Sequence, residues 1–415
     1  MSKKIFYGWY IVAACVLIAA AGIGFHNTAS IFIRPVTEDL GLSRGEFTFF
    51  RTIIVILGAA LLPAYGKLAQ KVSIKKIMII GTTISSISLI GYSLATYLWQ
   101  FYLVAIINGI FVNASHFMLI GILISRWFSD KRGLALGIAF AGSGFGAAVM
   151  VPLASWVIEI FDWRWGFRFS GVAALIVLIP TILLLLKEKP EDLGLSPYRE
   201  NGNDAPAAKK GEPTGLTLAE ARRTPAFWML AVALLGISMS AAAPNAHTAP
   251  FLGDLGYPVH VISAVVSLSM IVLTVGKILM GHVFDRFGTM FGGIALGVFC
   301  VLSPVFALLS VNPLAPWLHA IFLGLASTGF SIPVNIFAMK YFGEKDFPAI
   351  LSVLSMIMAF GSAFSPPVMG LAYDVLGDYS IAWVTLAVVG MVVTLGFVGV
   401  NLSGRRALNN LPQPL

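Results

Sequence analysis

One polar stretch divides this chain: residues 187–225 read KEKPEDLGLSPYRENGNDAPAAKKGEPTGLTLAEARRTP. Charged residues, proline, glycine and asparagine are concentrated there, and large apolar side chains are few. Such a composition is typical of a solvated linker rather than a packed segment. Because the sequence on either side is long and apolar, the linker predicts a chain built from two halves.

Twelve apolar runs, each long enough to cross a bilayer, flank this linker, six on each side. They cover residues 8–33, 47–68, 76–97, 101–124, 133–158, 166–186, 226–252, 260–282, 288–310, 315–339, 348–373 and 380–402. The 415 residues are 58% hydrophobic and 11% charged, with a mean hydropathy of +0.88. A soluble protein would carry about 25% charged residues. We therefore predict an all-α membrane protein with twelve transmembrane helices in two six-helix bundles.

The domain boundaries that follow are an N-terminal bundle over 1–187, a cytoplasmic linker over 188–225 and a C-terminal bundle over 226–415. Gly66–Lys71 after the second run and Gly281–Arg286 after the eighth are similar and occupy corresponding places, which indicates duplicated halves.

Lysine and arginine set the orientation. With both termini in the cytoplasm, 21 of the 27 Lys and Arg residues lie in cytoplasmic segments and five outside. The first run is too long for a signal peptide, so we expect it to remain as a helix of an integral protein of the cell (inner) membrane.

The net charge of +8 does not indicate a nucleic-acid partner, because the basic residues lie between apolar runs and topology explains them. Cys15 and Cys300 lie far apart within apolar runs, without neighbours that could bind a metal. The glycines around Gly144 lack the lysine of a phosphate-binding loop. We expect no cofactor, no metal and no enzymatic activity.

Lys277 is the remaining cation, and it lies inside an apolar run, four to five residues from the expected cytoplasmic end near Gly281. An ionised side chain at the bilayer centre costs about 3 kcal/mol. One interpretation is that the lysine snorkels to the headgroups. The other is that it is the counter-ion of an anionic substrate. A lysine is a point charge, which suits a single carboxylate better than a rigid dicarboxylate clamp.

The other candidates are histidine and asparagine side chains within apolar runs: His26, Asn27, Asn113, His116, Asn245, His247 and Asn335. They are predicted to hydrogen-bond a substrate, and the alternative is that they pack between helices. Because no Asp or Glu lies near the middle of a run, a histidine would carry any coupled proton. Pro244 and Pro250 predict a bend in the seventh run.

Several motifs resemble the major facilitator superfamily, and within it the oxalate/formate antiporter and monocarboxylate transporter branch. They are Tyr7–Val12, Arg126–Ile138 between the fourth and fifth runs, Gly142–Gly146, Trp163–Arg164 and Lys189–Leu195. The resemblance implies two bundles that rock about a central cavity lined by spans one, four, seven and ten, and it implies a monomer.

The sequence differs from this branch at three kinds of position. Gln70 and Lys71 replace the acid and arginine of the first inter-helix motif, which Asp285–Gly288 retains. Gly276–Lys277 stands where the family has Gly-Arg with a carboxylate-binding arginine. Met356 occupies the place of the second cation of oxalate transporters.

We therefore predict a secondary active transporter of small organic anions, with monocarboxylates favoured, that works by alternating access in membrane lipid. Proton coupling stays open. One alternative is an exporter of neutral or hydrophobic compounds with the same fold, in which Lys277 is structural. An alternative of another class is a non-transporting membrane sensor, although no segment resembles an output domain.

Overall fold

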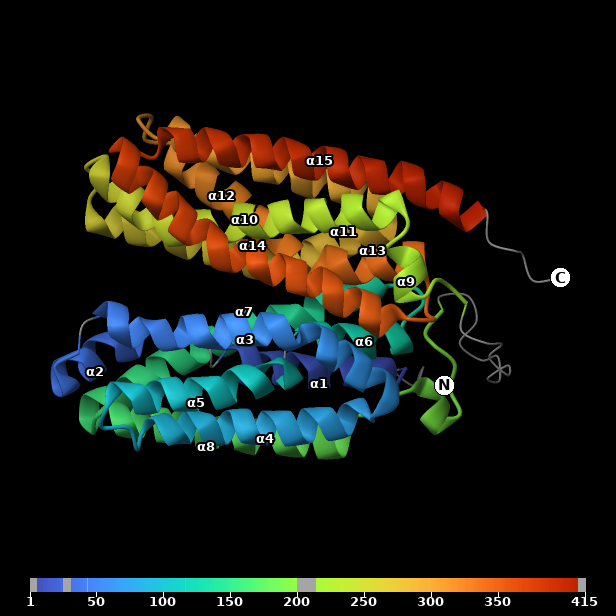
Figure 1. The fold of residues 1–415 in the computed structure, drawn as a ribbon, viewed down its shortest axis with the longest axis horizontal. Helices are drawn as coiled ribbons and strands as arrows, with labels where there is room; N and C mark the ends of the chain where they lie inside the picture. Colours follow the sequence, from blue (N-terminus) through green and yellow to red (C-terminus); the bar gives the residue numbers. More distant parts are fainter. Residues whose placement is uncertain (1–5, 25–30, 43, 116, 200–213, 410–415) are drawn as a thin grey trace, which may run out of the picture. The chain divides into compact units, whose positions relative to one another are not determined.

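The computed structural model describes residues 6–24, 31–42, 44–115, 117–199 and 214–409. Over these ranges the chain is almost entirely helical and contains no β-strand, only two isolated backbone bridges (Figure 1). The all-α prediction is therefore confirmed. The chain forms two compact units, Met1–Lys209 and Lys210–Leu415. The predicted limits of the linker, 188 and 225, remain a proposal.

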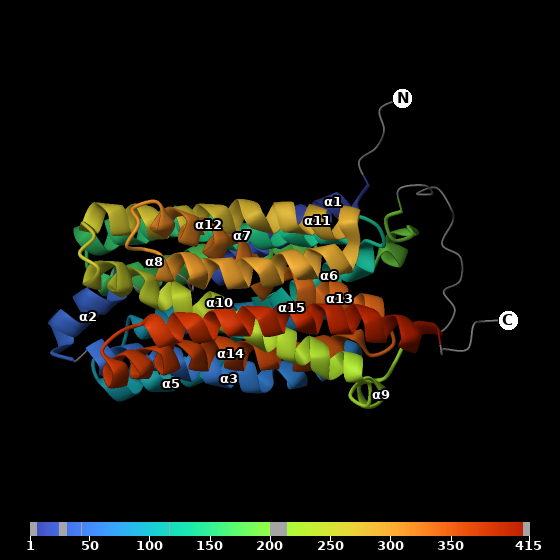
Figure 2. The ribbon, with the colours of Figure 1, turned by 90° about the horizontal axis from the view of Figure 1, so that it is seen from above.

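Long antiparallel helices make up the first unit (Figure 2). Its α-helices are α1 (Gly8–Ala19), α2 (Ile33–Leu40), α3 (Arg44–Lys71), α4 (Ile74–Tyr92), α5 (Leu98–Phe111), α6 (Phe117–Trp127), α7 (Arg132–Ile160) and α8 (Trp163–Pro180). Short π- and 3-10-helical segments extend or join them: η1 (Ala20–Gly24), η3 (Val112–Ser115), η4 (Thr181–Leu185) and η5 (Pro190–Leu193). The main helix pairs are α4 with α8, α3 with α5, and α1 with α7.

The second unit has the same kind of construction. Its elements are α9 (Leu218–Ala221), α10 (Pro225–Asp254), α11 (Val259–Leu308), α12 (Ala315–Ser327), η6 (Thr328–Phe330), α13 (Ile332–Phe342), α14 (Phe347–Leu376) and α15 (Ser380–Asn409). Here α11 packs against α12 and α15, and α10 packs against α14 and α15.

The described residues contain nine helices that are long and apolar enough to cross a membrane, and the bent pair α12–α13 adds a tenth. One of the nine, α11, has 50 residues and consists of two helices joined at Gly288, about 43 Å and about 30 Å long at about 1.5 Å per residue, and each is long enough for a hydrocarbon core of about 30 Å. It therefore accounts for two crossings. The shorter apolar helix Gly8–Gly22 lies within the first predicted span, so each of the twelve predicted spans lies on a described apolar helix.

A single residue divides α11 into its two crossings. Gly288 has φ 77° and ψ 177°, whereas the residues on either side of it are helical. Side chains rarely adopt such a positive φ, so glycine suits this position. The sequence placed the gap between the two runs at 283–287, but the helix continues to Phe287. The charged residues Asp285 and Arg286 thus extend the helix beyond the apolar run, because helix formation does not require an apolar side chain.

Two further crossings are broken near their middle. In the first unit η3 separates α5 from α6, and in the second unit η6 separates α12 from α13 with a bend of 43°. These are the fourth and tenth spans, which occupy corresponding positions in the two halves. By contrast, α10 remains α-helical through both Pro244 and Pro250. The seventh span thus has no break in its helical assignment, and the bend that these prolines predict stays a prediction.

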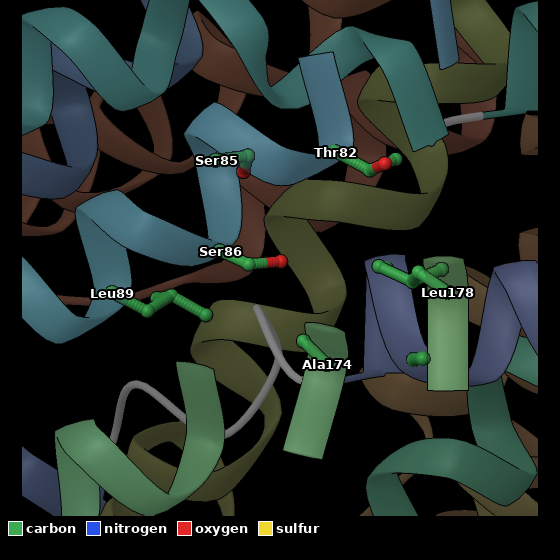
Figure 3. A pocket seen from close by; sticks show the side chains of 8 residues that line it. Thr82, Ser85, Ser86, Leu89, Ala174 and Leu178 are labelled. Carbon is green, nitrogen blue, oxygen red and sulfur yellow. The ribbon is translucent and has the colours of Figure 1, made fainter. Parts of the chain in front are cut away.

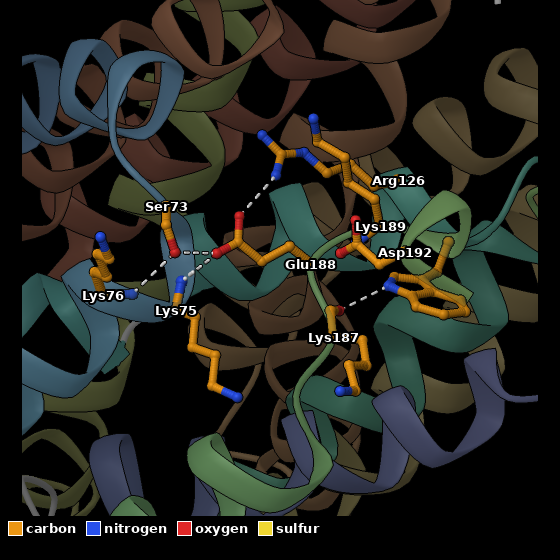
Figure 4. Close-up of polar contacts among 9 residues, drawn as sticks. Ser73, Lys75, Lys76, Arg126, Lys187, Glu188, Lys189 and Asp192 are labelled. Atoms are coloured by element: carbon orange, nitrogen blue, oxygen red, sulfur yellow. Dashed lines mark hydrogen bonds and ion pairs between the residues drawn. The ribbon is translucent and has the colours of Figure 1, made fainter. Parts of the chain in front are cut away.

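A carboxylate joins the helix ends where the first unit leads into the linker (Figure 4). Glu188 accepts hydrogen bonds from the backbone N–H of Lys75, at 3.0 Å, and from the hydroxyl of Ser73, the N-cap of α4. Its other oxygen lies 3.7 Å from the guanidinium of Arg126. Burial raises the pKa of Glu188, but the hydrogen bonds and Arg126 outweigh it, so the pKa lies below its ordinary value. Glu188 thus supplies an acidic side chain in this basic region, where the first inter-helix motif has Gln70 in place of its usual acid.

The two described ends of the linker are each attached at the C-terminal end of a helix in the unit beside them. In the first unit the N–H of Tyr198 donates to the carbonyl of Trp127 at 2.8 Å. In the second unit the N–H of Leu216 donates to the carbonyl of Phe342, also at 2.8 Å, and Asp346 accepts from the N–H of Leu218 at 2.9 Å. The two helix ends belong to α6 and α13, which are again corresponding positions.

The opposite end of the first unit carries the short helix α2 (Figures 1 and 2). Asp39 of α2 accepts from the indole N–H of Trp163 at 3.0 Å and from the guanidinium of Arg164 at 2.8 Å. These two donors hold the pKa of Asp39 below its ordinary value. Beneath them an aromatic cluster that includes Phe32 and Phe167 fixes α2 to the bundle.

Candidate substrate-binding site

The structure places five of the eight predicted site residues. Lys277, Asn245, His247 and Asn335 belong to the second unit, and Asn113 belongs to the first. The other three, His26, Asn27 and His116, lie outside the described residues. The second unit is therefore the part in which the candidate site can be built from contacts.

Lys277 is buried within the second unit, with an exposed fraction of 6%. It lies on α11 about 16 Å before the Gly288 break, at about 1.5 Å per residue. The adjacent Gly276 faces the tenth span, since a Cβ there would lie 3.0 Å from Thr328 and 3.4 Å from Leu325. A lysine that snorkels along the lipid-facing surface would be exposed in the protein alone. The burial of Lys277 favours a position in the bundle interior.

The break in the tenth span gathers hydroxyl and amide groups. Asn245 of α10 donates to the hydroxyl of Ser327 at 3.2 Å and to its own helix at the carbonyl of Ala241. After the break, Asn335 donates to the carbonyl of Ser331 at 2.9 Å. In the part of the chain that the structure describes, Oδ1 of Asn335 and Oγ of Ser331 are buried without a hydrogen-bond partner. Such unsatisfied polar atoms are costly in a packed interior and often mark a functional site.

His247 points away from the Asn245 side of α10. One ring nitrogen lies 3.2 Å from the hydroxyl of Tyr379 and the other 2.9 Å from the carbonyl of Pro366. A neutral imidazole satisfies both, because Nε2–H donates to the carbonyl and Nδ1 accepts from the tyrosine. Both ring nitrogens thus already have partners, which is what the packing interpretation requires. Its role towards a substrate stays a prediction.

Asn113 lies at the break in the fourth span. Its side-chain N–H donates to the carbonyl of Gly58 on α3 at 2.6 Å, and the residue is buried. The amide therefore joins two helices of the first unit. The role of Asn113 towards a substrate stays a prediction.

A fully buried histidine on α12, His319, was not among the predicted residues. Its Nδ1 lies 2.8 Å from the carbonyl and 3.2 Å from the hydroxyl of Ser303, on α11. Its Nε2 lies 2.9 Å from the hydroxyl of Thr248, on α10, and its ring meets Trp383 edge-on at 5.4 Å. His319 thus connects four helices of the second unit. The sequence signal was available, since His319 lies within the tenth apolar run.

A small pocket lies inside the first unit between η1, α4 and α8 (Figure 3). Its lining is small and weakly polar: Ala21, Gly22, Thr82, Ser85, Ser86, Leu89, Ala174 and Leu178. Thr82 donates to its own helix at Met78, and Ser85 donates to Asn108 at 3.2 Å. No candidate site residue lines this pocket. We therefore attribute it to the packing of small side chains.

Both the sequence and the fold are similar to those of known proteins. The sequence profile of the Major Facilitator Superfamily matches residues 12–345 and 254–414. The chain belongs to this superfamily. It is consequently a membrane transporter and not an enzyme, and it is an integral membrane protein.

Relatives and solved structures agree with this assignment. Mouse monocarboxylate transporter 12 is 22% identical over 418 residues, covering 94% of this chain and 85% of that protein. Rat monocarboxylate transporter 3 is 28% identical over 166 residues, covering 40% of this chain and 34% of that protein. The structure of the E. coli fucose:proton symporter superposes with a TM-score of 0.67 at 15% identity, covering 95% of this chain and 98% of that one. The last comparison shows a shared fold.

Proposed function

We propose that this transporter carries small monocarboxylates by alternating access and that Lys277 is the counter-ion of the substrate carboxylate. The observation that carries the proposal is the burial of Lys277 within the second unit, at 6% exposure. An ionisable side chain buried in a membrane span is costly and rare, and by default it marks a functional site. The monocarboxylate transporters among the relatives support the choice of substrate.

The polar groups of the broken tenth span support the same site. Gly276, beside Lys277, packs against Thr328 at the start of the break. Ser331 and Asn335 follow this break and retain unsatisfied polar atoms. We propose that these groups hydrogen-bond the substrate oxygens that Lys277 does not hold. Asn27, His26, Asn113, His116, Asn245 and His247 are retained as the further candidates.

For the membrane arrangement, we propose that both termini face the cytoplasm of the cell (inner) membrane and that the protein acts as a monomer. The lysine-rich turn Lys67–Lys76 and Arg126 then lie on the cytoplasmic side, in agreement with the positive-inside rule. Labelling of single cysteines introduced at Lys76 and in α2 with an impermeant reagent tests this arrangement, because only one of the two should react from outside.

Uptake into proteoliposomes tests the function. Purified protein is reconstituted and offered labelled lactate, pyruvate, acetate, formate and oxalate, with and without a pH gradient. We expect saturable uptake of at least one monocarboxylate, little uptake of oxalate, and loss of uptake in Lys277→Ala. The exposed Lys76→Ala is the matched control and should behave as the unaltered protein. Uptake of no acid, or full activity in Lys277→Ala, would favour an exporter of neutral or hydrophobic compounds.

A further inference from the structure

The node around His319 in the second unit has no part in the substrate site proposed above. It consists of His319 on α12, Thr248 on α10, Ser303 on α11 and Trp383 on α15. These four side chains are fully or almost fully buried. A histidine buried among four helices is an expensive packing residue, since a neutral apolar side chain would avoid the cost of its polar atoms.

The hydrogen bonds at this node leave each neutral form of His319 incomplete. The Ser303 carbonyl can only accept, and it lies 2.8 Å from Nδ1, so Nδ1 must carry a proton. Nε2 then needs a donor, and the one near it is the Thr248 hydroxyl at 2.9 Å. That hydroxyl has one hydrogen, and it already lies 2.6 Å from the carbonyl of Pro244. It cannot donate to both.

The opposite neutral tautomer is no better. With the proton on Nε2, the imidazole donates to Thr248, which in turn donates to Pro244. The Nδ1 lone pair then faces the carbonyl oxygen of Ser303, which is repulsive, and the serine hydroxyl at 3.2 Å offers only a long bond.

The imidazolium satisfies all of these atoms. Nδ1–H donates to the Ser303 carbonyl, Nε2–H donates to the Thr248 hydroxyl, and that hydroxyl donates to the Pro244 carbonyl. Burial opposes the charge, because an ion loses its hydration here. Hydrogen bonding thus favours the proton and burial disfavours it. The balance will shift with any conformational change that admits water.

We propose that His319 is the proton-binding site of this transporter. Nε2 takes one proton from water when the node is hydrated and returns it to water later in the cycle, and no bond other than N–H forms or breaks. When His319 binds the proton, the Thr248 hydroxyl donates to the Pro244 carbonyl and no longer to Nε2. Proton binding therefore changes a hydrogen bond of α10, the helix that also carries Asn245. The coupling of this proton to substrate rests on the proposed monocarboxylate transport, whereas the binding of the proton does not.

Among the side chains of this node, His319 is the one that can change its charge by binding a proton. Its partners Thr248, Ser303 and Trp383 carry no formal charge. Of the titratable groups on the packed elements, Cys300 on α11, His247 on α10 and Tyr379 just before α15 lie within a few residues of the node's side chains. Other groups lie further along the same helices: Asp254 on α10, and His260, Lys277, His282, Asp285 and Arg286 on α11. His247 and Tyr379 are bonded to each other. Apolar side chains, among them Ala320 and Leu252, belong to the neighbouring core.

Direct observation of the ring decides the proposal without any substrate. Protein labelled with ¹⁵N-histidine in lipid vesicles is followed by NMR from about pH 5 to about pH 8, the range in which histidine changes charge. His319→Asn, which keeps a donor for the Ser303 carbonyl, assigns the signal by its loss. We expect the His319 nitrogens to change together from a neutral to an imidazolium pattern. A single neutral tautomer throughout this range would overturn the proposal.

Thr248→Val provides an independent variant if His319→Asn does not fold. It removes the acceptor of Nε2–H, and the loss of a hydrogen bond to a charged group should move half-protonation of His319 by about one pH unit towards acid. An unchanged midpoint would contradict the proposed network.

Transport then tests the coupling. In His319→Asn, exchange of labelled for unlabelled substrate at equal pH should persist, whereas accumulation driven by a pH gradient should be lost. The exposed His282→Gln is the control and should retain both. Gradient-driven accumulation in His319→Asn would refute the proton role. If the unaltered protein transports no carboxylate, the proposed function fails, and the NMR titration still decides whether His319 binds the proton.

Discussion

The contact between α7 and the first span gives a prediction whose size follows from the structure. A Cβ added to Gly146 would lie 2.1 Å from the carbonyl oxygen of Ala20 and 2.5 Å from its Cα. Both atoms belong to the backbone, so no side chain can rotate away. Ordinary contacts begin at 3.4 Å, and the helices would have to separate by about 1.3 Å to admit a methyl group. A Cβ added to Gly142, one turn earlier, would lie 2.3 Å from the carbonyl oxygen of Val16.

We therefore expect Gly146→Ala to destabilise the first unit by about 1–3 kcal/mol, the usual cost of an overpacked contact. In a domain of about 200 residues each kcal/mol lowers the melting temperature by about 2–4 °C. The assay is thermal unfolding of the purified protein in detergent, followed by intrinsic fluorescence and by loss of the monodisperse peak.

The matched control is the same substitution where there is room. Gly91 on α4 has its nearest neighbours at 3.6 Å, the methyl groups of Val104. Gly91→Ala should be neutral or stabilise the helix by about 0.5–1 kcal/mol, because alanine loses less backbone entropy. If Gly146→Ala melts at or above the temperature of the unaltered protein, the proposed backbone contact between α7 and the first span is wrong.

Three further predictions concern single polar residues. Glu188→Gln should lower the melting temperature at neutral pH. Because folding lowers the pKa of Glu188, its contribution is complete above the ordinary value of about 4.3 and is lost as the pH falls through the folded-state value, so the two proteins should converge in acid. Asp39→Asn should change the melting temperature by little, since the ion pair of Asp39 with Arg164 is half-exposed and such pairs contribute about 0–1 kcal/mol. A large fall in the melting temperature would show that α2 depends on this ion pair. Asn335→Leu should raise the melting temperature while weakening uptake, because it removes an unsatisfied buried oxygen that we assign to the substrate; reduced stability with unchanged uptake would make Asn335 a packing residue.

The sequence predicts much of the fold because lipid imposes a simple rule. Every crossing needs about 20 apolar residues, so the runs of the sequence reveal the spans. The gap between the two crossings of α11 was also visible, although the helix continues to Phe287 through charged residues. The breaks at η3 and η6 were not predicted, although Asn113 in η3, Gly329 in η6 and Pro333 just after η6 are weak helix formers.

The candidate site is less predictable because a helix that is apolar all round does not reveal which face points where. Asn245 and His247 are two residues apart, yet the first contacts α12 and the second contacts α14 and Tyr379. His319 resembles any other histidine in an apolar run, and only the distances to Ser303 and Thr248 distinguish it. Lys277 was identified because a cation in a span is rare.

The role of Lys277 is tested most directly by the initial uptake rate of the transported monocarboxylate in Lys277→Met and Lys277→Arg. Methionine keeps the apolar stem without the charge, and arginine keeps the charge. Loss of a charged hydrogen bond should lower kcat/KM by about 10- to 100-fold in Lys277→Met. Lys277→Arg should retain a measurable part of the activity. Equal uptake by Lys277→Met and the unaltered protein would contradict the assignment of Lys277 as the substrate counter-ion.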